Sequence, residues 1–252
     1  MSKNILVVKD LEKIYDKKKV VKGIDFHVEK GEIFGILGPN GAGKTTTLEM
    51  IEAMRPIDGG SATLDGIDVA NHPSKIKGII GIQPQTAAFE EKTKLTEILN
   101  FFAAAYGEKI DPMKLLKDVQ LEDKASSYAE NLSGGQRQRF SIAAALVHNP
   151  KIFFLDEPTT GLDPQARRNL WDLIKDIRKR GVTVIMTTHY MEEAELLCDR
   201  VAIMDEGKII AMDSPKALVK ALLGRGFKKK KHVEQADLED VFIDLTGKDL
   251  RE

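Results

Sequence analysis

Residues 31–46 read GEIFGILGPNGAGKTT, and this stretch decides the fold of the chain. The apolar run 33–37 predicts a buried strand, and a helix is predicted from about residue 43 to residue 54, before Pro56 stops it. The pattern G-x-x-x-x-G-K-[ST] between them is typical of a loop whose backbone N–H groups surround phosphate groups, with the positive helix end favouring their charge. A plain glycine-rich turn is the alternative, and the strand-to-helix setting disfavours it. We therefore expect a nucleotide site at Gly38, Pro39, Asn40, Gly41, Ala42, Gly43, Lys44, Thr45 and Thr46.

The segments around this loop predict an α/β fold with a parallel sheet. Apolar runs at 152–155 and 182–186 alternate with helical segments such as 165–180, which is the βα pattern of parallel strands. Three strand-like runs separated by turn residues predict a small antiparallel sheet, at 5–8, 20–28 and 61–64.

Two further regions complete the predicted order of elements. Apolar residues at three- and four-residue spacings from 93 to 127 predict a helical insertion. Beyond Asp199 the sequence predicts strands at 201–204 and 208–212, then a helix at 215–223 that Ser214 caps.

Composition places limits on partners and compartment. The 252 residues carry 38 basic and 39 acidic side chains, so the net charge of −1 gives no reason to expect a nucleic-acid partner. The single cysteine, Cys198, cannot form an internal disulfide and has apolar neighbours, which fits a reducing cytoplasm. No apolar run approaches the ~20 residues that span a bilayer, and the first residues lack a secretory signal. We expect a cytoplasmic protein.

A pair of carboxylates follows the second buried strand, at Asp156 and Glu157. Open α/β sheets bind ligands at the carboxyl ends of their strands, so we expect this pair beside the glycine loop. Lys44 is then predicted to bridge phosphate oxygens, Thr45 and Asp156 to hold Mg²⁺, and Glu157 to polarise the attacking water as a general base. An acidic pair after a strand is alternatively a helix cap.

Residues 132–139 read LSGGQRQR, and they indicate a family. Ser133 is expected to cap a helix that runs to about residue 147, while Gly134 and Gly135 leave the start of that helix open to a phosphate. With this signature the chain resembles the ATPases of ATP-binding cassette (ABC) transporters over nearly its whole length. The resemblance implies a P-loop NTPase with a RecA-like parallel-sheet core, a small antiparallel β subdomain and a helical subdomain at about 86–147. The ATPase domain would span 1–223, with a short tail at 224–252 that holds a lysine-rich loop and a terminal helix.

The resemblance also assigns roles to four other positions. Tyr15 stands where the family stacks an aromatic ring on adenine, although a core or strand-edge tyrosine is an equal alternative. Gln85 matches the glutamine loop that touches Mg²⁺ or its water and senses the membrane subunit, and its preceding proline selects it over Gln83. Asp163 matches a loop that crosses between subunits and would equally cap a helix before Pro164. His189 matches the switch histidine that contacts the γ-phosphate.

The resemblance further implies a shared site. Two cassettes would associate head to tail, with each ATP between the glycine loop of one and Ser133, Gly134, Gly135 and Gln136 of the other. A homodimer would hold two complete sites, and a heterodimer is the alternative. The pair would work at the cytoplasmic face of the membrane beneath a separate integral membrane permease.

Three kinds of ABC protein remain to be distinguished. One glycine loop and one signature argue against the two-cassette proteins that act on ribosomes, and the stretch between these motifs is too short for the coiled coil of DNA-repair relatives. The ending at 238–248 resembles that of bacterial ABC-2-type exporter ATPases, with an importer ATPase as the alternative. The lysine run 228–231 is expected to be a solvated loop, or alternatively a contact to anionic lipid.

Overall fold

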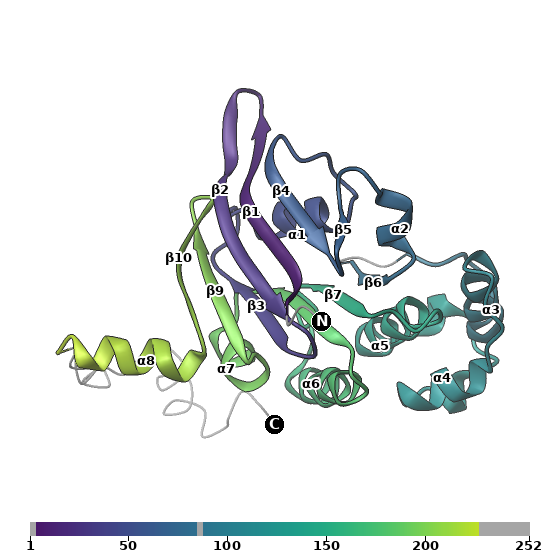
Figure 1. Cartoon of the computed structure of the whole chain (residues 1–252). Helices are drawn as coiled ribbons and strands as arrows, with labels where there is room; N and C mark the ends of the chain where they lie inside the picture. Colours follow the sequence, from purple (N-terminus) through teal and green to yellow (C-terminus); the bar gives the residue numbers. More distant parts are fainter. Residues whose placement is uncertain (1–3, 85–87, 227–252) are drawn as a thin grey trace, which may run out of the picture. The chain divides into compact units, whose positions relative to one another are not determined.

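A computed structural model of the chain describes residues 4–84 and 88–226 (Figure 1). Two compact units divide the chain, one from Met1 to Leu218 and the other from Val219 onward. Gln85, the lysine run 228–231 and the ending at 238–248 lie outside the described residues. Among the described residues no helix is both long enough and apolar enough to cross a bilayer.

The first unit contains two β-sheets. The smaller is antiparallel in the order β2-β1-β4-β5, with β1 at Asn4–Tyr15, β2 at Lys18–Glu29, β4 at Gly59–Leu64 and β5 at Ile67–Asp68. The larger has the order β10-β9-β3-β8-β7-β6, formed by β3 (Ile33–Leu37), β6 (Ile80–Gln83), β7 (Ile152–Asp156), β8 (Thr183–Thr188), β9 (Arg200–Asp205) and β10 (Lys208–Asp213). Its strands are parallel except β10, which runs antiparallel to β9. The predicted α/β core and antiparallel subdomain are both confirmed.

The helices follow the predicted order, with several short elements added. Their bounds are α1 Lys44–Ile51, α2 Pro73–Lys77, α3 Leu95–Ala105, α4 Pro112–Asp118, α5 Gly134–Ala145, α6 Pro164–Lys179, α7 Met191–Leu197 and α8 Pro215–Gly224. The short elements β5, α2, β6 and α7 were not predicted, because two to seven residues are too few to show a periodic pattern. The expected caps are present, since Ser133, Asp163 and Ser214 each accept a bond from a backbone N–H in the first turn of the following helix.

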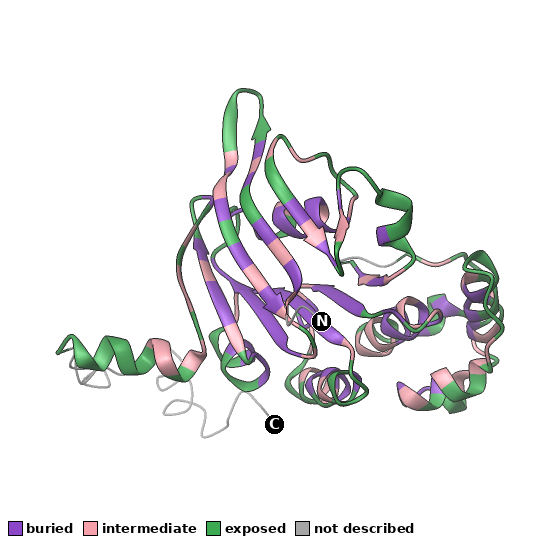
Figure 2. Cartoon of the chain, in the orientation of Figure 1, coloured by how far each residue is buried: buried purple, intermediate pink, exposed green. Residues whose placement is uncertain are grey.

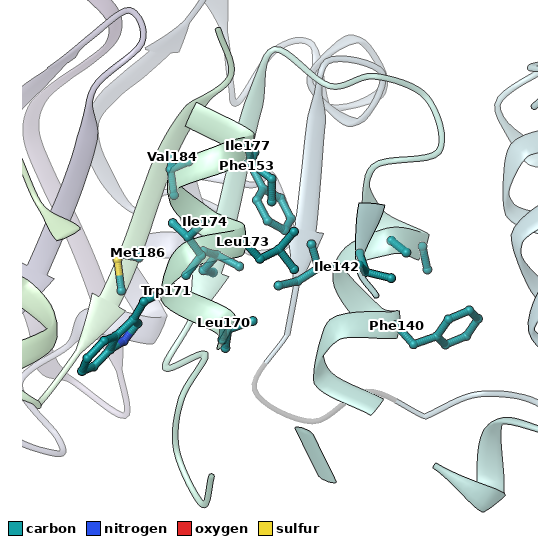
Figure 3. Packing of buried hydrophobic residues seen from close by; sticks show 14 of the residues in the cluster. Phe140, Ile142, Phe153, Leu170, Trp171, Leu173, Ile174, Ile177, Val184 and Met186 are labelled. Atoms are coloured by element: carbon teal, nitrogen blue, oxygen red, sulfur yellow. The ribbon is translucent and has the colours of Figure 1, made fainter. Parts of the chain in front are cut away.

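Successive side chains of the central strands point to opposite faces of the larger sheet, so the hydrophobic core is divided between these two faces. On β7, Phe153 and Leu155 pack with α5 and α6, whereas Ile152 and Phe154 pack with α1 and the antiparallel sheet. Figure 3 shows Leu173 and Ile174 of α6 among the residues of the first cluster. The strands β3, β7 and β8 of the larger sheet are almost wholly buried (Figure 2), as expected when both faces are covered.

This burial fixes where ligands can reach the sheet. The strands β3, β7 and β8 are adjacent and parallel, so their carboxyl ends meet at one edge. The glycine loop follows β3, Glu157 follows β7, and His189 follows β8. The fold therefore brings three separate segments of the sequence together at that edge.

Candidate functional site

The glycine loop has the backbone that its sequence predicts. Gly41 and Gly43 have φ angles of 81° and 102°, in the left-handed region that favours glycine. A Cβ atom on Gly38 would lie 2.1 Å from the backbone oxygen of Met204, so only glycine fits between this loop and β9. The start of the loop thus packs against β9, and the glycines at positions 41 and 43 allow the backbone turn that leads into α1.

Lys44 is buried beneath this loop. Its ammonium group donates to the backbone oxygens of Gly38, at 2.9 Å, and Pro39, at 3.1 Å. The same Nζ atom lies 3.1 Å from Oε1 of Glu157, and the side chains are only 4% and 9% exposed. Lys44 therefore holds the loop closed and pairs with the carboxylate that follows β7.

Glu157 has partners on both sides. Its Oε2 atom lies 3.1 Å from Nδ1 of His189 and accepts a bond of 3.3 Å from the hydroxyl of Thr160. Burial would raise the pKa of Glu157, but Lys44 and His189 together outweigh this effect and leave the pKa below its usual value. Glu157 is consequently a carboxylate at neutral pH, as a proton acceptor must be.

Asp156 faces the start of α1. The hydroxyl of Thr45 lies 3.1 Å and 3.0 Å from its two carboxylate oxygens. A carboxylate and a hydroxyl are oxygen ligands of the kind that Mg²⁺ prefers. The structure thus brings together the two residues of the predicted metal site that it describes.

A hollow of about 470 Å³ opens over these groups. Its lining contains eight predicted residues, namely Asn40, Gly41, Gly43, Lys44, Thr45, Thr46, Glu157 and His189. Gly38, Pro39 and Ala42 do not line it, and Ala42 is buried at 2% exposure. Val20 and Thr160 line the hollow and were not predicted. Thr160 could have been found from its position three residues after Glu157, whereas Val20 belongs to β2 and carries no local signal.

Three of the four predicted signature residues, Ser133, Gly135 and Gln136, line a different hollow of about 230 Å³, and Gly134 does not line it. Ser133 and Gln136 form a capping box, in which the backbone N–H of each donates to the side chain of the other. Asp163 lines the same hollow while it accepts a 2.9 Å bond from the backbone N–H of Ala166. The two hollows share no lining residue, so the described chain presents the predicted phosphate loop and the predicted signature at separate places.

The two remaining predictions have different outcomes. Tyr15 lies at the end of β1, 36% exposed, with the ammonium of Lys13 at 5.4 Å and the guanidinium of Arg55 at 5.8 Å from its ring. This ring is not part of the core, which leaves the adenine role and the strand-edge alternative. Gln85 lies outside the described residues, while Gln83 is fully buried and donates to the backbone oxygen of Pro84 at 2.6 Å.

One further residue connects the carboxylates and was not predicted. The hydroxyl of Thr187 lies 2.5 Å from Oδ1 of Asp156 and 3.0 Å from the backbone nitrogen of Glu157. Thr187 is fully buried on β8. The sequence shows only a threonine in an apolar run, and it joins the site because β8 pairs with β7.

Comparisons with known proteins agree with this geometry. The family described as ABC transporter matches residues 21–160 of the chain. The linearmycin resistance ATP-binding protein LnrL of Bacillus subtilis (strain 168) is 42% identical over 225 residues, which cover 87% of this chain and 72% of that protein. The Nod factor export ATP-binding protein I of Burkholderia pseudomallei (strain K96243) is 43% identical over 219 residues, covering 85% and 72% of the two chains.

A solved structure extends the likeness to three dimensions. The ATP-binding subunit of an ABC transporter superposes with a TM-score of 0.79 at 29% identity, over 96% of this chain and 99% of that one. The extent of these matches, together with the loop, the carboxylates and the signature, places the chain in the ABC transporter family as one of its ATP-binding ATPases.

Proposed function

We propose that this chain hydrolyses ATP as one of two cassettes that close around the nucleotide and drive export through a separate membrane permease. The observation that carries the proposal is the separation of the two hollows. The phosphate hollow holds Lys44, Glu157 and His189, whereas Ser133 and Gln136 line the other. A second copy, placed head to tail, would bring its signature helix to the open side of the first hollow.

Each residue of the phosphate hollow then has a chemical role. Lys44 would leave Glu157 and bind phosphate oxygens, because a triphosphate offers it more negative charge. Glu157 would accept a proton from the attacking water, and His189 would hold the γ-phosphate and orient that water. The signature helix of the partner would place backbone N–H groups and its positive end against the same phosphate.

The described residues also suit Mg²⁺ as a partner of ATP. Thr45 and Asp156 would hold the ion, and Gln85 would contact it or its water. No group of three or more His, Cys, Asp or Glu side chains that could hold a metal occurs within residues 4–84 and 88–226. This fits an ion that takes most of its ligands from phosphates and water, as Mg²⁺ does. When bound, the ion would neutralise charge that develops on the phosphates.

Export through a membrane partner is supported by the relatives and by one surface. One relative is named for Nod factor export and another for linearmycin resistance. A largely apolar hollow of about 370 Å³, between β6 and the helices α3 and α5, is lined by Pro84, Phe89, Phe102 and Tyr106 among others. Pro84 and Ala88, which flank residues 85–87 in the sequence, line this hollow, and we propose that the permease contacts it at the cytoplasmic face of the membrane.

Size-exclusion chromatography of Glu157→Gln tests the shared site. With ATP and Mg²⁺ the variant should elute as a dimer, because nucleotide binds but the slow hydrolysis no longer opens the pair. Lys44→Ala is the matched control and should remain monomeric. A Glu157→Gln variant that binds ATP yet stays monomeric would contradict the shared site.

Purification with the native membrane fraction should recover an integral membrane protein, and recovery of ribosomes or DNA would contradict the transport role.

A further inference from the structure

Thr187 connects the two carboxylates through a single hydroxyl group. Asp156 and Thr187 are register partners in the parallel pair β7–β8, and β7 ends at Asp156. The hydroxyl donates to Oδ1 of Asp156 at 2.5 Å and accepts from the backbone N–H of Glu157 at 3.0 Å. The donor and acceptor functions of this hydroxyl are therefore divided between two neighbouring residues of the proposed site.

The bond to Glu157 acts on an unusual backbone. Glu157 has a φ angle of 46°, in the left-handed region that residues with a Cβ atom rarely adopt. Such a conformation persists only when neighbouring groups hold it. The N–H of Glu157 lies just beyond the end of β7. It donates to the hydroxyl of Thr187, which stands in for the backbone oxygen that accepts such a bond within a sheet. This bond helps to keep the Glu157 side chain between Lys44 and His189.

The bond to Asp156 acts on the other carboxylate. Thr187 holds Oδ1, and Thr45 lies 3.1 Å from Oδ1 and 3.0 Å from Oδ2. Because Thr187 is fully buried and does not line the phosphate hollow, its hydroxyl is not exposed to a ligand in that hollow. Any effect of Thr187 on the reaction must act through Asp156 and Glu157.

We propose that Thr187 is a positioning residue of the ATPase, whose hydroxyl sets the Asp156 carboxylate for Mg²⁺ and the Glu157 backbone for proton transfer. This inference rests on the proposed roles of Asp156 and Glu157. It assigns the function to a hydroxyl and not to the bulk of the side chain. Serine at position 187 should therefore preserve ATP hydrolysis, because it keeps the hydroxyl. Valine has nearly the same shape as threonine but no hydroxyl, so it should not preserve hydrolysis.

The same strand offers a matched control. Thr183 is also fully buried on β8, and its hydroxyl accepts a 2.9 Å bond from the backbone N–H of Gly31 at the opposite end of the strand. Thr183→Val therefore removes one buried hydroxyl from the same strand without touching the site. Thermal unfolding of both valine variants would show whether their losses of stability are similar.

The experiment compares ATP hydrolysis and nucleotide binding in Thr187→Val, Thr187→Ser and Thr183→Val. For Thr187→Val we expect kcat to fall about 10- to 100-fold while the KM for ATP changes less than about 3-fold, because the carboxylates are misplaced after ATP has bound. The Mg²⁺ concentration that supports binding of a fluorescent ATP analogue should rise several-fold, with binding in EDTA unchanged. Thr187→Ser and Thr183→Val should keep kcat within about 3-fold of the parent chain.

Several results would overturn the proposal. A parental kcat in Thr187→Val, or an equal loss of kcat in Thr183→Val, would show that the hydroxyl has no special role. If Thr187→Val does not fold, Thr187→Ala must show the same loss of kcat, and parental turnover by that variant would refute the inference. Glu157→Gln distinguishes failure of the Thr187 role from failure of the proposed function. Rapid hydrolysis by Glu157→Gln would refute the proposed function itself, whatever the Thr187 variants show.

Discussion

Glu157→Gln should bind a non-hydrolysable ATP analogue more tightly than the parent chain does. In the structure Lys44 is paired with Glu157 at 3.1 Å, and both side chains are buried. A triphosphate must take the ammonium group away from this carboxylate before it can bind there. Glutamine carries no charge, so the substitution removes the competitor while it preserves the shape of the side chain.

The size of the gain follows from the bonds that are exchanged. A hydrogen bond to a charged group contributes about 1.5–3 kcal/mol in proteins. The net gain in binding free energy is smaller than this, because neither group depends on this bond alone. Lys44 also donates to Gly38 and Pro39, and Glu157 also contacts His189. A net gain of about 1.4 kcal/mol corresponds to about tenfold tighter binding.

Isothermal titration calorimetry with the analogue measures this gain, at protein concentrations where both chains are monomeric. His189→Ala should show no such gain, because the pair between Lys44 and Glu157 remains intact. Glu157→Asp keeps the negative charge but shortens the side chain, so it distinguishes release of Lys44 from loss of repulsion between carboxylate and phosphate. Equal or weaker affinity in Glu157→Gln would refute the competition between carboxylate and phosphate for Lys44.

Three other substitutions have clear expected outcomes. Lys44→Ala should weaken ATP binding by about 1.5–3 kcal/mol or more and abolish phosphate release, both measurable in parallel titrations. His189→Ala should bind ATP like the parent chain and release phosphate about 10²–10⁴ times more slowly, and parental turnover would remove His189 from the mechanism. Burial, with further contributions from Asp156 and Glu49, raises the pKa of Glu52 to about 8 from its usual 4.5. The folded chain then binds more protons than the unfolded chain between these pH values, so the Glu52 contribution to stability is complete below pH ~4.5 and is lost towards pH ~8, at up to about 1.4 kcal/mol per pH unit. Glu52→Gln should reduce this dependence in urea unfolding at pH 5.5 and 8.5, and an unchanged slope would show that Glu52 does not cause it.

The parts of the site that depend on local sequence could be predicted. The glycine loop needs only a strand, a turn and a helix that follow one another, and six of its nine predicted residues line the phosphate hollow. The caps at Ser133 and Asp163 are equally local, because each bonds a backbone N–H three residues further on. The carboxyl ends of parallel strands share one edge, which is why Asp156 and Glu157 were expected near the loop, whereas His189 was assigned through the family resemblance.

The parts that depend on register and side-chain direction could not be predicted. Thr187 enters the site because β8 pairs with β7 so that Thr187 lies opposite Asp156, and a shift by one residue would turn its hydroxyl to the other face. Val20 comes from the antiparallel sheet, far from the loop in sequence. The contact between Lys44 and Glu157 depends on the positions of two side chains, about which the motifs say nothing.

That contact follows from the same burial that makes the loop a phosphate site. An ammonium group that is only 4% exposed is strongly destabilising unless an anion or acceptors lie against it. In the structure the anion within reach is the carboxylate of Glu157, the proposed general base. In the proposed function, binding of phosphate to Lys44 would therefore also release Glu157 from this ion pair and leave it paired with His189, which lines the same hollow. Substrate binding and release of the proposed base would then be two results of one exchange of partners at Lys44.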